Sequence, residues 1–356
     1  MPVEVSEAIE TNTHLRFASQ SPDACDEAAT SEDGSCSGQS DRKRWGLILA
    51  GGDGMRLRSL TRLISGDDRP KQFCNVIGRD TLFEQTRRRA AQSIPAHRTI
   101  IALTASHKKY YQRCLGSSLS CRLVQPRNLG TAPPIILSLL YIASRAPDAV
   151  VAVLPSDHYY SDEVAFHATL ESAFRLAGEH QHSVILLGAP PRGPEVELGW
   201  IKLGATVGES AYRVRGFEEK PAIEIALQLF ASGSLWNTFV MVGNVSAFLW
   251  MSFVSLPQLF TTLSDSLPLH DEDGDLRVPD NLYEAITTAD FSRRVLSLNA
   301  RSLLALRLHQ VEWHDLGCPD RVVSAVCAQG QRFPSWMSKL GRGRQAGPTQ
   351  SSLPSI

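Results

Sequence analysis

The chain has 356 residues, which is enough for one large domain or two ordinary ones. Its 36 Lys and Arg residues are balanced by 37 Asp and Glu residues, and this near-neutral charge argues against nucleic acid or an anionic membrane as a partner. The chain contains no run of 18 apolar residues and no secretory signal pattern, so we expect a cytoplasmic protein. The seven cysteines are scattered without a C-x-x-C pair, which indicates reduced thiols rather than disulfides or a zinc site.

Both ends of the chain differ from its middle. Residues 1–44 are rich in Ser, Asp, Glu and Ala and show no apolar period, which predicts a disordered polar tail. Residues 331–356 are interrupted by Gly, Ser and Pro and predict a second flexible tail. We therefore expect one folded domain over 45–330.

Short apolar runs alternate with helical patterns through the first half of this domain. Continuous Val, Ile and Leu runs are typical of strands buried on both faces, and alternation with helices predicts parallel βαβ crossovers. The expected strands are 45–50, 99–103, 121–124, 149–154 and 183–187, and the expected helices are 82–93, 106–115, 134–144 and 162–177. The predicted fold class is α/β, with a doubly wound, mostly parallel sheet.

The pattern of apolar residues changes after residue 189. Two alternating segments, 200–203 and 212–217, predict a β-ribbon added to the sheet. We expect a helix at 222–232, a strand at 236–242 and a helix from about 245 onward. The region 263–280 is acidic and has no clear period, so we expect irregular surface there.

The first strand runs directly into Gly51-Gly52-Asp53-Gly54-Met55-Arg56. Glycines let the main chain approach a ligand and direct N–H groups at phosphate oxygens, and Arg56 adds a charged donor. No Gly-Lys-Ser/Thr follows, which excludes a Walker loop, and Leu57 stands where a dinucleotide fingerprint needs glycine. The segment is either a phosphate cradle or an ordinary glycine-rich turn.

Other polar residues follow the expected strands, at the edge of an open α/β sheet where ligands bind. Gln125 offers an amide for the edge of a base, and Gly130 would let a ring lie against the main chain. Asp157 is either a Mg²⁺ ligand or a helix cap. Lys71, after Pro70, is either a point charge for phosphate or a solvated loop residue.

Eight short motifs over 45–320 combine these features: Gly51-Gly52-x-Gly54-x-Arg56-Leu57, Pro70-Lys71-Gln72-Phe73, Gly130-Thr131-Ala132-Pro133, Pro155-Ser156-Asp157-His158, Gly199-Trp200-Ile201, Phe217-Glu218-Glu219-Lys220-Pro221, Trp236-Asn237 and Trp313-His314-Asp315-Leu316-Gly317. In this order they resemble the sugar nucleotidyltransferases, and most closely the mannose-1-phosphate guanylyltransferases. The resemblance implies a Rossmann-like fold with a β-ribbon sugar-binding region. It implies nucleotidyl transfer from GTP to α-D-mannose 1-phosphate, giving GDP-mannose and pyrophosphate, and association of copies into a homo-oligomer.

The resemblance also implies a role for each matching residue. Gly51, Gly52, Gly54, Gln125 and Gly130 would bind the nucleotide, and Gly199, Glu219, Lys220 and Asn237 would bind the sugar phosphate. The implied catalytic residues are Arg56, Lys71, Asp157 and Lys220, and the implied Mg²⁺ ligands are Asp157 and Asp315.

Two residues depart from the family pattern. Met55 stands where the family usually has Thr, and Phe239 stands where it commonly has Gly. We expect Phe239 to narrow the sugar pocket or to displace its strand. Two alternatives therefore stay open: the same reaction with glucose 1-phosphate and UTP or dTTP, and a non-catalytic regulator that binds a sugar nucleotide.

Aromatic and histidine neighbours of these motifs have two interpretations. His158 and His314 would suit a softer metal, but side chains alternate along a strand, which argues against Asp157 and His158 reaching one ion. Trp200 and Trp236 are either stacking surfaces or core residues, and the core interpretation is favoured.

Overall fold

The computed structural model describes residues 43–116, 119–208, 210–272, 275–328, 334 and 336–337. The two expected tails lie outside these residues except at their inner edges, and they stay predictions. No helix within the described ranges is both long and apolar enough to cross a bilayer.

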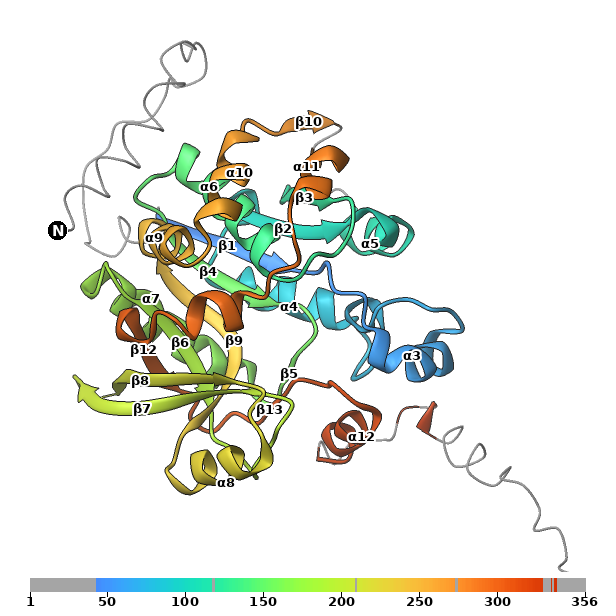
Figure 1. The fold of residues 1–356 in the computed structure, drawn as a ribbon. Coiled ribbons are helices and arrows are strands. Elements are labelled where there is room, and N and C mark those ends of the chain that lie inside the picture. The colour runs from blue at the N-terminus through green and yellow to red at the C-terminus, as the bar shows by residue number, and fades with distance from the viewer. Residues whose placement is uncertain are drawn as a thin grey trace, which may run out of the picture.

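A single large sheet organises the described chain (Figure 1). Its strand order is β10-β11-β3-β2-β1-β4-β9-β6-β12-β8-β7. Neighbours from β11 through β4 run parallel, as do β6 and β12, whereas β9 is antiparallel to both β4 and β6. The strands are β1 (Arg44–Leu49), β2 (Thr99–Thr104), β3 (Cys121–Gln125), β4 (Val150–Pro155), β6 (Val184–Ala189), β7 (Gly199–Val207), β8 (Ala211–Glu219), β9 (Leu235–Asn244), β10 (His270–Glu272), β11 (Asp275–Arg277) and β12 (Leu303–Arg307).

Helices cover both faces of the sheet, so the doubly wound α/β prediction is confirmed. Alternate residues of one strand enter different cores: Leu47 packs with α6 (Ala132–Arg145), α9 (Val245–Ser255) and α10 (Pro257–Asp265). The next residue, Ile48, packs with α4 (Leu82–Ala90), α5 (Lys108–Leu115) and α7 (Glu163–Glu179). Burial on both faces explains why these strands appear in the sequence as unbroken runs of apolar residues.

The predicted ribbon is present as the antiparallel pair β7 and β8. In Figure 1 it lies at the end of the sheet beside α8 (Ile223–Ala231), far from β10. Trp200 is fully buried against Ala226 and Leu229 of that helix, and its indole N–H donates to the Glu195 carbonyl at 2.8 Å. The core interpretation of Trp200 is therefore confirmed.

The expectation of irregular surface at 263–280 was wrong for the described residues. Leu263 is fully buried at the end of α10, and β11 extends the parallel sheet by pairing with β3. With three residues, β11 is too short to show an alternating pattern in the sequence. Its single leucine, Leu276, is buried but stands among acidic residues, which are typical of a surface. The sequence interpretation also overlooked β12, which continues the parallel pairing next to β6.

A separate two-stranded sheet lies beside the large one. It pairs β5 (Tyr159–Tyr160) with β13 (Trp313–His314), matching Tyr160 with Trp313 and Tyr159 with His314. The antiparallel pairing brings the chain after β4 against a segment more than 150 positions later. A further core, between α3 (Arg58–Ser65) and α12 (Pro319–Ala328), supports both segments.

Candidate active site

The carboxyl ends of the central strands open into a cavity of about 350 Å³. The ribbon and the segment around Asp290 complete its wall. Nine of the residues implied by the family resemblance line it: Gly51, Gly52, Gln125, Gly130, Asp157, Gly199, Glu219, Asn237 and Asp315. Four others, Gly54, Arg56, Lys71 and Lys220, are not part of the lining.

Main-chain carbonyl groups of the glycine loop, residues 51–54, and of Ala50 before it accept hydrogen bonds from side chains of the protein. Thr104 Oγ1 donates to the Gly51 carbonyl at 2.8 Å, and Gln72 Nε2 donates to the carbonyls of Ala50 and Gly52 at 3.1 and 2.8 Å. Within the described ranges, no group accepts a hydrogen bond from the main-chain N–H groups of 52–54. The loop thus keeps donors available for a ligand while its acceptors are used, which suits an anion.

The three glycines of this loop, Gly51, Gly52 and Gly54, differ in what an added side chain would meet. Gly54 has a φ of 59°, and a Cβ there would lie 3.1 Å from the main-chain nitrogen of Lys71. A Cβ at Gly51 would lie 2.4 Å from Gln125 Nε2. A Cβ at Gly52 would meet no atom within 4 Å, although Gly52 lines the cavity. Packing therefore explains Gly51 and Gly54, whereas Gly52 leaves open space on the cavity side.

Gly130 also has a structural role that the sequence interpretation did not include. Its φ is 89°, and a Cβ would lie 2.3 Å from the Ala289 carbonyl oxygen. The loop 128–131 and the segment near Ala289 are in main-chain contact, since Ala289 N–H donates to the Leu129 carbonyl at 3.0 Å. The glycine is thus needed to close this wall of the cavity, whatever ring lies against it.

Lys71 lies behind the cavity wall, between the two implied metal ligands. Its Nζ is 3.2 Å from Asp157 Oδ2 and donates to the Asp315 carbonyl at 2.5 Å. Burial alone would raise the pKa of Asp157, but the Lys71 ammonium and the neighbouring His158 hold it below its usual value. Asp157 is therefore a carboxylate at neutral pH.

The β5–β13 pairing places Asp315 on the same wall as Asp157. The Asp315 carboxylate points toward α12, where its Oδ1 is 3.1 Å from Arg321 Nη1. No cluster of three or more potential metal-binding side chains occurs in the described part of the chain. Two carboxylates sharing one cavity still fit Mg²⁺, which takes one or two protein carboxylates and fills its other positions with phosphate and water oxygens.

The prediction that Asp157 and His158 point to opposite faces was wrong, because β4 ends at Pro155 and the alternation of side chains stops there. His158 Nε2 lies 3.5 Å from Asp157 Oδ1. Trp313 Nε1–H, which can only donate, is 3.3 Å from His158 Nδ1, so the proton of a neutral ring is on Nε2. Burial lowers the pKa of His158, and a neutral ring then has no lone pair on Nε2, the nitrogen nearest to Asp157.

Two implied phosphate-binding cations lie at the margin of the site. Arg56 is largely exposed, and its Nη1 reaches across to Glu197 Oε2 at 2.5 Å, lowering the pKa of that carboxyl. Lys220 follows β8 with a φ of 52°, and its N–H donates to the Leu198 carbonyl at 3.2 Å. Glu197 and Leu198 both line the cavity, so the Arg56 guanidinium and the Lys220 main chain lie next to its wall.

The ribbon side of the cavity carries a carboxyl and an amide. A Cβ at Gly199 would lie 2.7 Å from Glu219 Oε2, so the glycine makes room for this side chain. Burial, and then the nearby Asp290, raise the pKa of Glu219 to about 7. Asn237 Oδ1 accepts the Phe239 N–H at 3.1 Å, which leaves the Asn237 Nδ2 group available as a donor.

Phe239 lines the cavity with an unusual backbone conformation. Its φ is 62°, in the left-handed region that bulky residues rarely adopt, and it lies where the pairing of β9 with β6 shifts register. The irregularity directs the Phe239 side chain to the cavity, as expected for a residue that narrows the sugar side. Met55, the other departure, is 59 % exposed and lies outside the lining.

Several residues of the site carried no sequence signal. Asn128, Asp290 and Ser292 line the cavity but belong to no motif. Tyr283, fully buried, donates to Gln125 Oε1 at 2.8 Å from a segment for which the sequence predicted no element and no site residue. Only the packing of distant segments identifies these residues.

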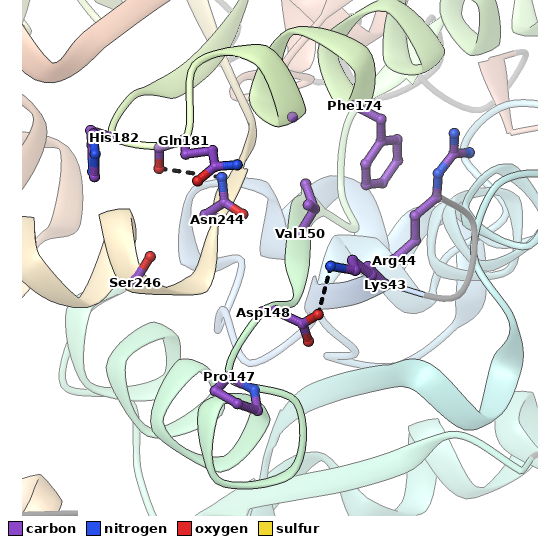
Figure 2. Close-up of a pocket in the computed structure, with 11 residues that line it drawn as sticks. Lys43, Arg44, Pro147, Asp148, Val150, Phe174, Gln181, His182, Asn244 and Ser246 are labelled. Atoms are coloured by element: carbon purple, nitrogen blue, oxygen red, sulfur yellow. Dashed lines mark hydrogen bonds and ion pairs between the residues drawn. The ribbon is translucent and has the colours of Figure 1, made fainter. Parts of the chain in front are cut away.

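A second hollow, of about 460 Å³, opens at the other ends of β1 and β4 (Figure 2). Its two cations are already paired, Lys43 with Asp148 at 2.7 Å and Arg44 with Glu171 at 2.8 Å. Asn244 Nδ2 donates to the carbonyls of Ala177 and Gln181. The hollow lies away from the carboxyl ends of the strands, where α/β sheets bind ligands, and contains none of the implied site residues.

Comparison with known proteins supports one family. The nucleotidyl transferase family profile matches residues 45–331. XanB of Xanthomonas campestris pv. campestris is 34 % identical over 208 residues, 57 % of this chain and 42 % of that protein. AlgA of Pseudomonas aeruginosa is 27 % identical over 278 residues, 76 % of this chain and 56 % of that protein. A mannose-1-phosphate guanylyltransferase of Sinorhizobium fredii is 26 % identical over 284 residues, 77 % of this chain and 53 % of that protein.

This chain thus spans about half the length of the curated relatives that it matches. Among solved structures, one described as a mannose-1-phosphate geranyltransferase from Thermus thermophilus is 28 % identical, with a TM-score of 0.67 over 77 % of this chain and 76 % of that one. The fold, the glycine loop and the family profile agree with the resemblance seen in the motifs. The chain belongs to the nucleotidyl transferase family.

Proposed function

We propose that this protein transfers a guanylyl group from GTP to α-D-mannose 1-phosphate, giving GDP-mannose and pyrophosphate. The observation that carries the proposal is the single cavity shared by the open face of Gly52, the carboxylates of Asp157 and Asp315, and the polar side chains of the ribbon. The names of several relatives favour mannose 1-phosphate and GTP as the substrate pair.

The reaction requires little proton chemistry from the protein. An oxygen of the sugar phosphate forms a bond to the α-phosphorus, and the bond from that phosphorus to the bridging oxygen breaks, releasing pyrophosphate. The attacking oxygen is already ionised at neutral pH, so no general base is needed. The main barrier is repulsion between two polyanions, which the protein lowers by positioning and by positive charge.

The cations next to the cavity would exchange partners when the nucleotide binds. Lys71 is paired with Asp157 and Arg56 with Glu197, so each ammonium or guanidinium is held near the wall without ligand. Triphosphate oxygens on the N–H groups of the glycine loop would compete for both. Binding thus replaces a carboxylate by a phosphate as the partner of each cation. Because both cations are already paired in the free protein, little additional desolvation of them is needed when the nucleotide binds.

The ribbon side suits a hydroxyl-rich sugar. The Glu219 carboxyl accepts hydrogen bonds and the Nδ2 group of Asn237 donates them, and Gly199 leaves room between them. Lys220, at the end of the same ribbon, would hold the sugar phosphate. Phe239 limits the space beside these groups.

Asp157 and Asp315 would hold Mg²⁺, and the metal would supply positive charge to the phosphates of both substrates. The residues themselves contribute ionised oxygens at one wall, and Lys71 holds Asp157 in the charged form. We also propose a cytoplasmic setting, supported by cysteines outside any disulfide at Cys74, Cys114, Cys318 and Cys327 in the described chain. Association of copies stays a prediction.

A panel assay tests the proposal. The protein is incubated with Mg²⁺, mannose 1-phosphate or glucose 1-phosphate, and each nucleoside triphosphate, and pyrophosphate release is measured. We expect release with GTP and mannose 1-phosphate. Release with glucose 1-phosphate and UTP or dTTP instead would assign another substrate pair. Phe239 in the cavity favours one further candidate, a non-catalytic regulator, which would bind GDP-mannose while releasing no pyrophosphate with any pair.

A further inference from the structure

A chain of hydrogen bonds runs from α11 (Asp280–Ala285) to the glycine loop. Tyr283 Oη donates to Gln125 Oε1 at 2.8 Å, Gln125 Nε2 donates to Thr104 Oγ1 at 3.1 Å, and Thr104 Oγ1 donates to the Gly51 carbonyl at 2.8 Å. The four residues come from four separate segments of the chain. Gln125 and Gly51 line the cavity, whereas Tyr283 and Thr104 do not.

The last acceptor in this series of hydrogen bonds, the Gly51 carbonyl, fixes which group donates in each of them. The Gly51 carbonyl can only accept, so the single hydroxyl proton of Thr104 is used there. Thr104 Oγ1 must therefore accept from Gln125, which places Nε2, and not Oε1, on that side. Oε1 then faces Tyr283, whose hydroxyl donates. If the amide were turned over, Oε1 and Thr104 Oγ1 would face each other as two acceptors with no proton between them.

The surroundings of the Gln125 amide hold it firmly. Gln125 is 2 % exposed and Tyr283 is fully buried, so neither hydrogen bond competes with bulk water. A Cβ at Gly51 would lie 2.4 Å from Nε2 and 2.9 Å from Thr104 Oγ1, so the glycine is needed for the amide to lie against the loop. One Nε2 N–H and one Oε1 lone pair remain for a ligand.

We propose that Tyr283 is a positioning residue that, together with Thr104, holds the Gln125 amide in one orientation and thereby sets which nucleobases the cavity accepts. A fixed amide with one free donor and one free acceptor complements a ring carbonyl beside a ring N–H. Guanine, uracil and thymine carry that pair, whereas adenine and cytosine carry an amino group beside a ring nitrogen and would need the amide turned over. The inference rests on the proposed nucleotide site and adds the class of base that it selects.

Four variants test this. Tyr283→Phe removes the donor to Oε1, and Thr104→Val frees the amide to turn, because Tyr283 can then accept from Nε2. Thr104→Ser keeps the hydroxyl. Tyr111→Phe removes a phenol hydroxyl from an equally buried side chain that does not line the cavity. For each, kcat and KM are measured with GTP, UTP, ATP and CTP, together with the melting temperature.

We expect Tyr283→Phe and Thr104→Val to raise the KM of GTP about tenfold, with kcat changed by less than about twofold. The GTP to ATP ratio of kcat/KM should fall most in Thr104→Val, Thr104→Ser should restore it, and Tyr111→Phe should leave it unchanged. Because Tyr283 acts through Gln125, Tyr283→Phe should have no further effect on this ratio in a Gln125→Met background.

Other results would overturn the inference. If Tyr283→Phe lowers the melting temperature or kcat and leaves the GTP to ATP ratio of kcat/KM unchanged, Tyr283 has a merely structural role. If Tyr283→Phe changes that ratio as much in the Gln125→Met background as in the wild type, Tyr283 does not act through Gln125. If the wild type turns over no substrate pair, the proposed reaction fails, and the same ratios are measured as dissociation constants by calorimetry. Nucleotides that do not bind, or that bind without preference, would end the proposal for base selection itself.

Discussion

Lys71 Nζ lies 3.2 Å from Asp157 Oδ2, and the same ammonium donates to the Asp315 carbonyl. One cation thus joins the two segments whose carboxylates we assign to Mg²⁺. The pairing of β5 with β13 supports this arrangement, because it aligns Tyr159, two residues after Asp157, with His314, directly before Asp315.

The first prediction concerns these carboxylates. Asp157→Asn and Asp315→Asn each remove a charge at the cavity wall, and we expect turnover to fall by at least about 100-fold in each. Asp148→Asn is the control, because Asp148 pairs with Lys43 in the hollow of Figure 2, away from the site. Pyrophosphate release and circular dichroism are measured. A rate near that of the wild type in either variant would remove that residue from the metal site.

The second prediction uses Gly52, whose missing side chain leaves only open space. Gly52→Ala should raise the KM of the nucleotide about tenfold, because the methyl group enters the space proposed for the triphosphate. Its melting temperature should stay the same or rise slightly, since alanine reduces the entropy of the unfolded chain. Gly178→Ala, also in open space but outside the cavity, is the matched control. An unchanged KM would place the phosphates elsewhere.

The third prediction follows from the raised pKa of Glu219, about 7. Between the ordinary carboxyl pKa and pH 7 the folded protein binds more protons than the unfolded chain at this group, so its contribution to stability is lost as pH rises. Glu219→Gln should therefore gain on the order of 1 kcal/mol in unfolding free energy over the wild type between pH 5 and pH 8.5. Urea unfolding at both pH values measures this, and an unchanged difference would disprove the shift.

The fourth prediction separates the two substrates. Lys220→Ala should raise the KM of the sugar 1-phosphate about 10- to 100-fold and leave the KM of the nucleotide nearly unchanged, because a charged hydrogen bond to the sugar phosphate is lost. Lys202→Ala, which breaks the pairing with Glu218 on the outer ribbon, serves as control. An effect confined to the nucleotide would mean that the role of Lys220 is wrongly assigned.

The sequence predicted most strands of the sheet and much of the cavity lining, because both leave local patterns in the sequence. Buried strands such as β1 and β4 are unbroken apolar runs, and Gly51, Gly52 and Asp157 follow them directly. The position of β9 between β4 and β6 was not predictable, since it depends on pairing between distant segments.

The partners of the site residues left no local mark. Tyr283 belongs to a helix of six residues, which is too short to show a helical period, and its contact with Gln125 spans 158 positions. The side-chain direction of His158 was misjudged because the strand ends at Pro155, before the alternation assumed for it. Such contacts depend on where segments meet in the folded chain.

The most direct test of the account is a crystal of the protein with GTP and Mn²⁺, in which anomalous scattering locates the metal. We predict one peak within about 2.5 Å of carboxylate oxygens of both Asp157 and Asp315 and also in contact with the triphosphate. A metal bound to only one of these residues, or to neither, would contradict the shared site on which the proposed reaction depends.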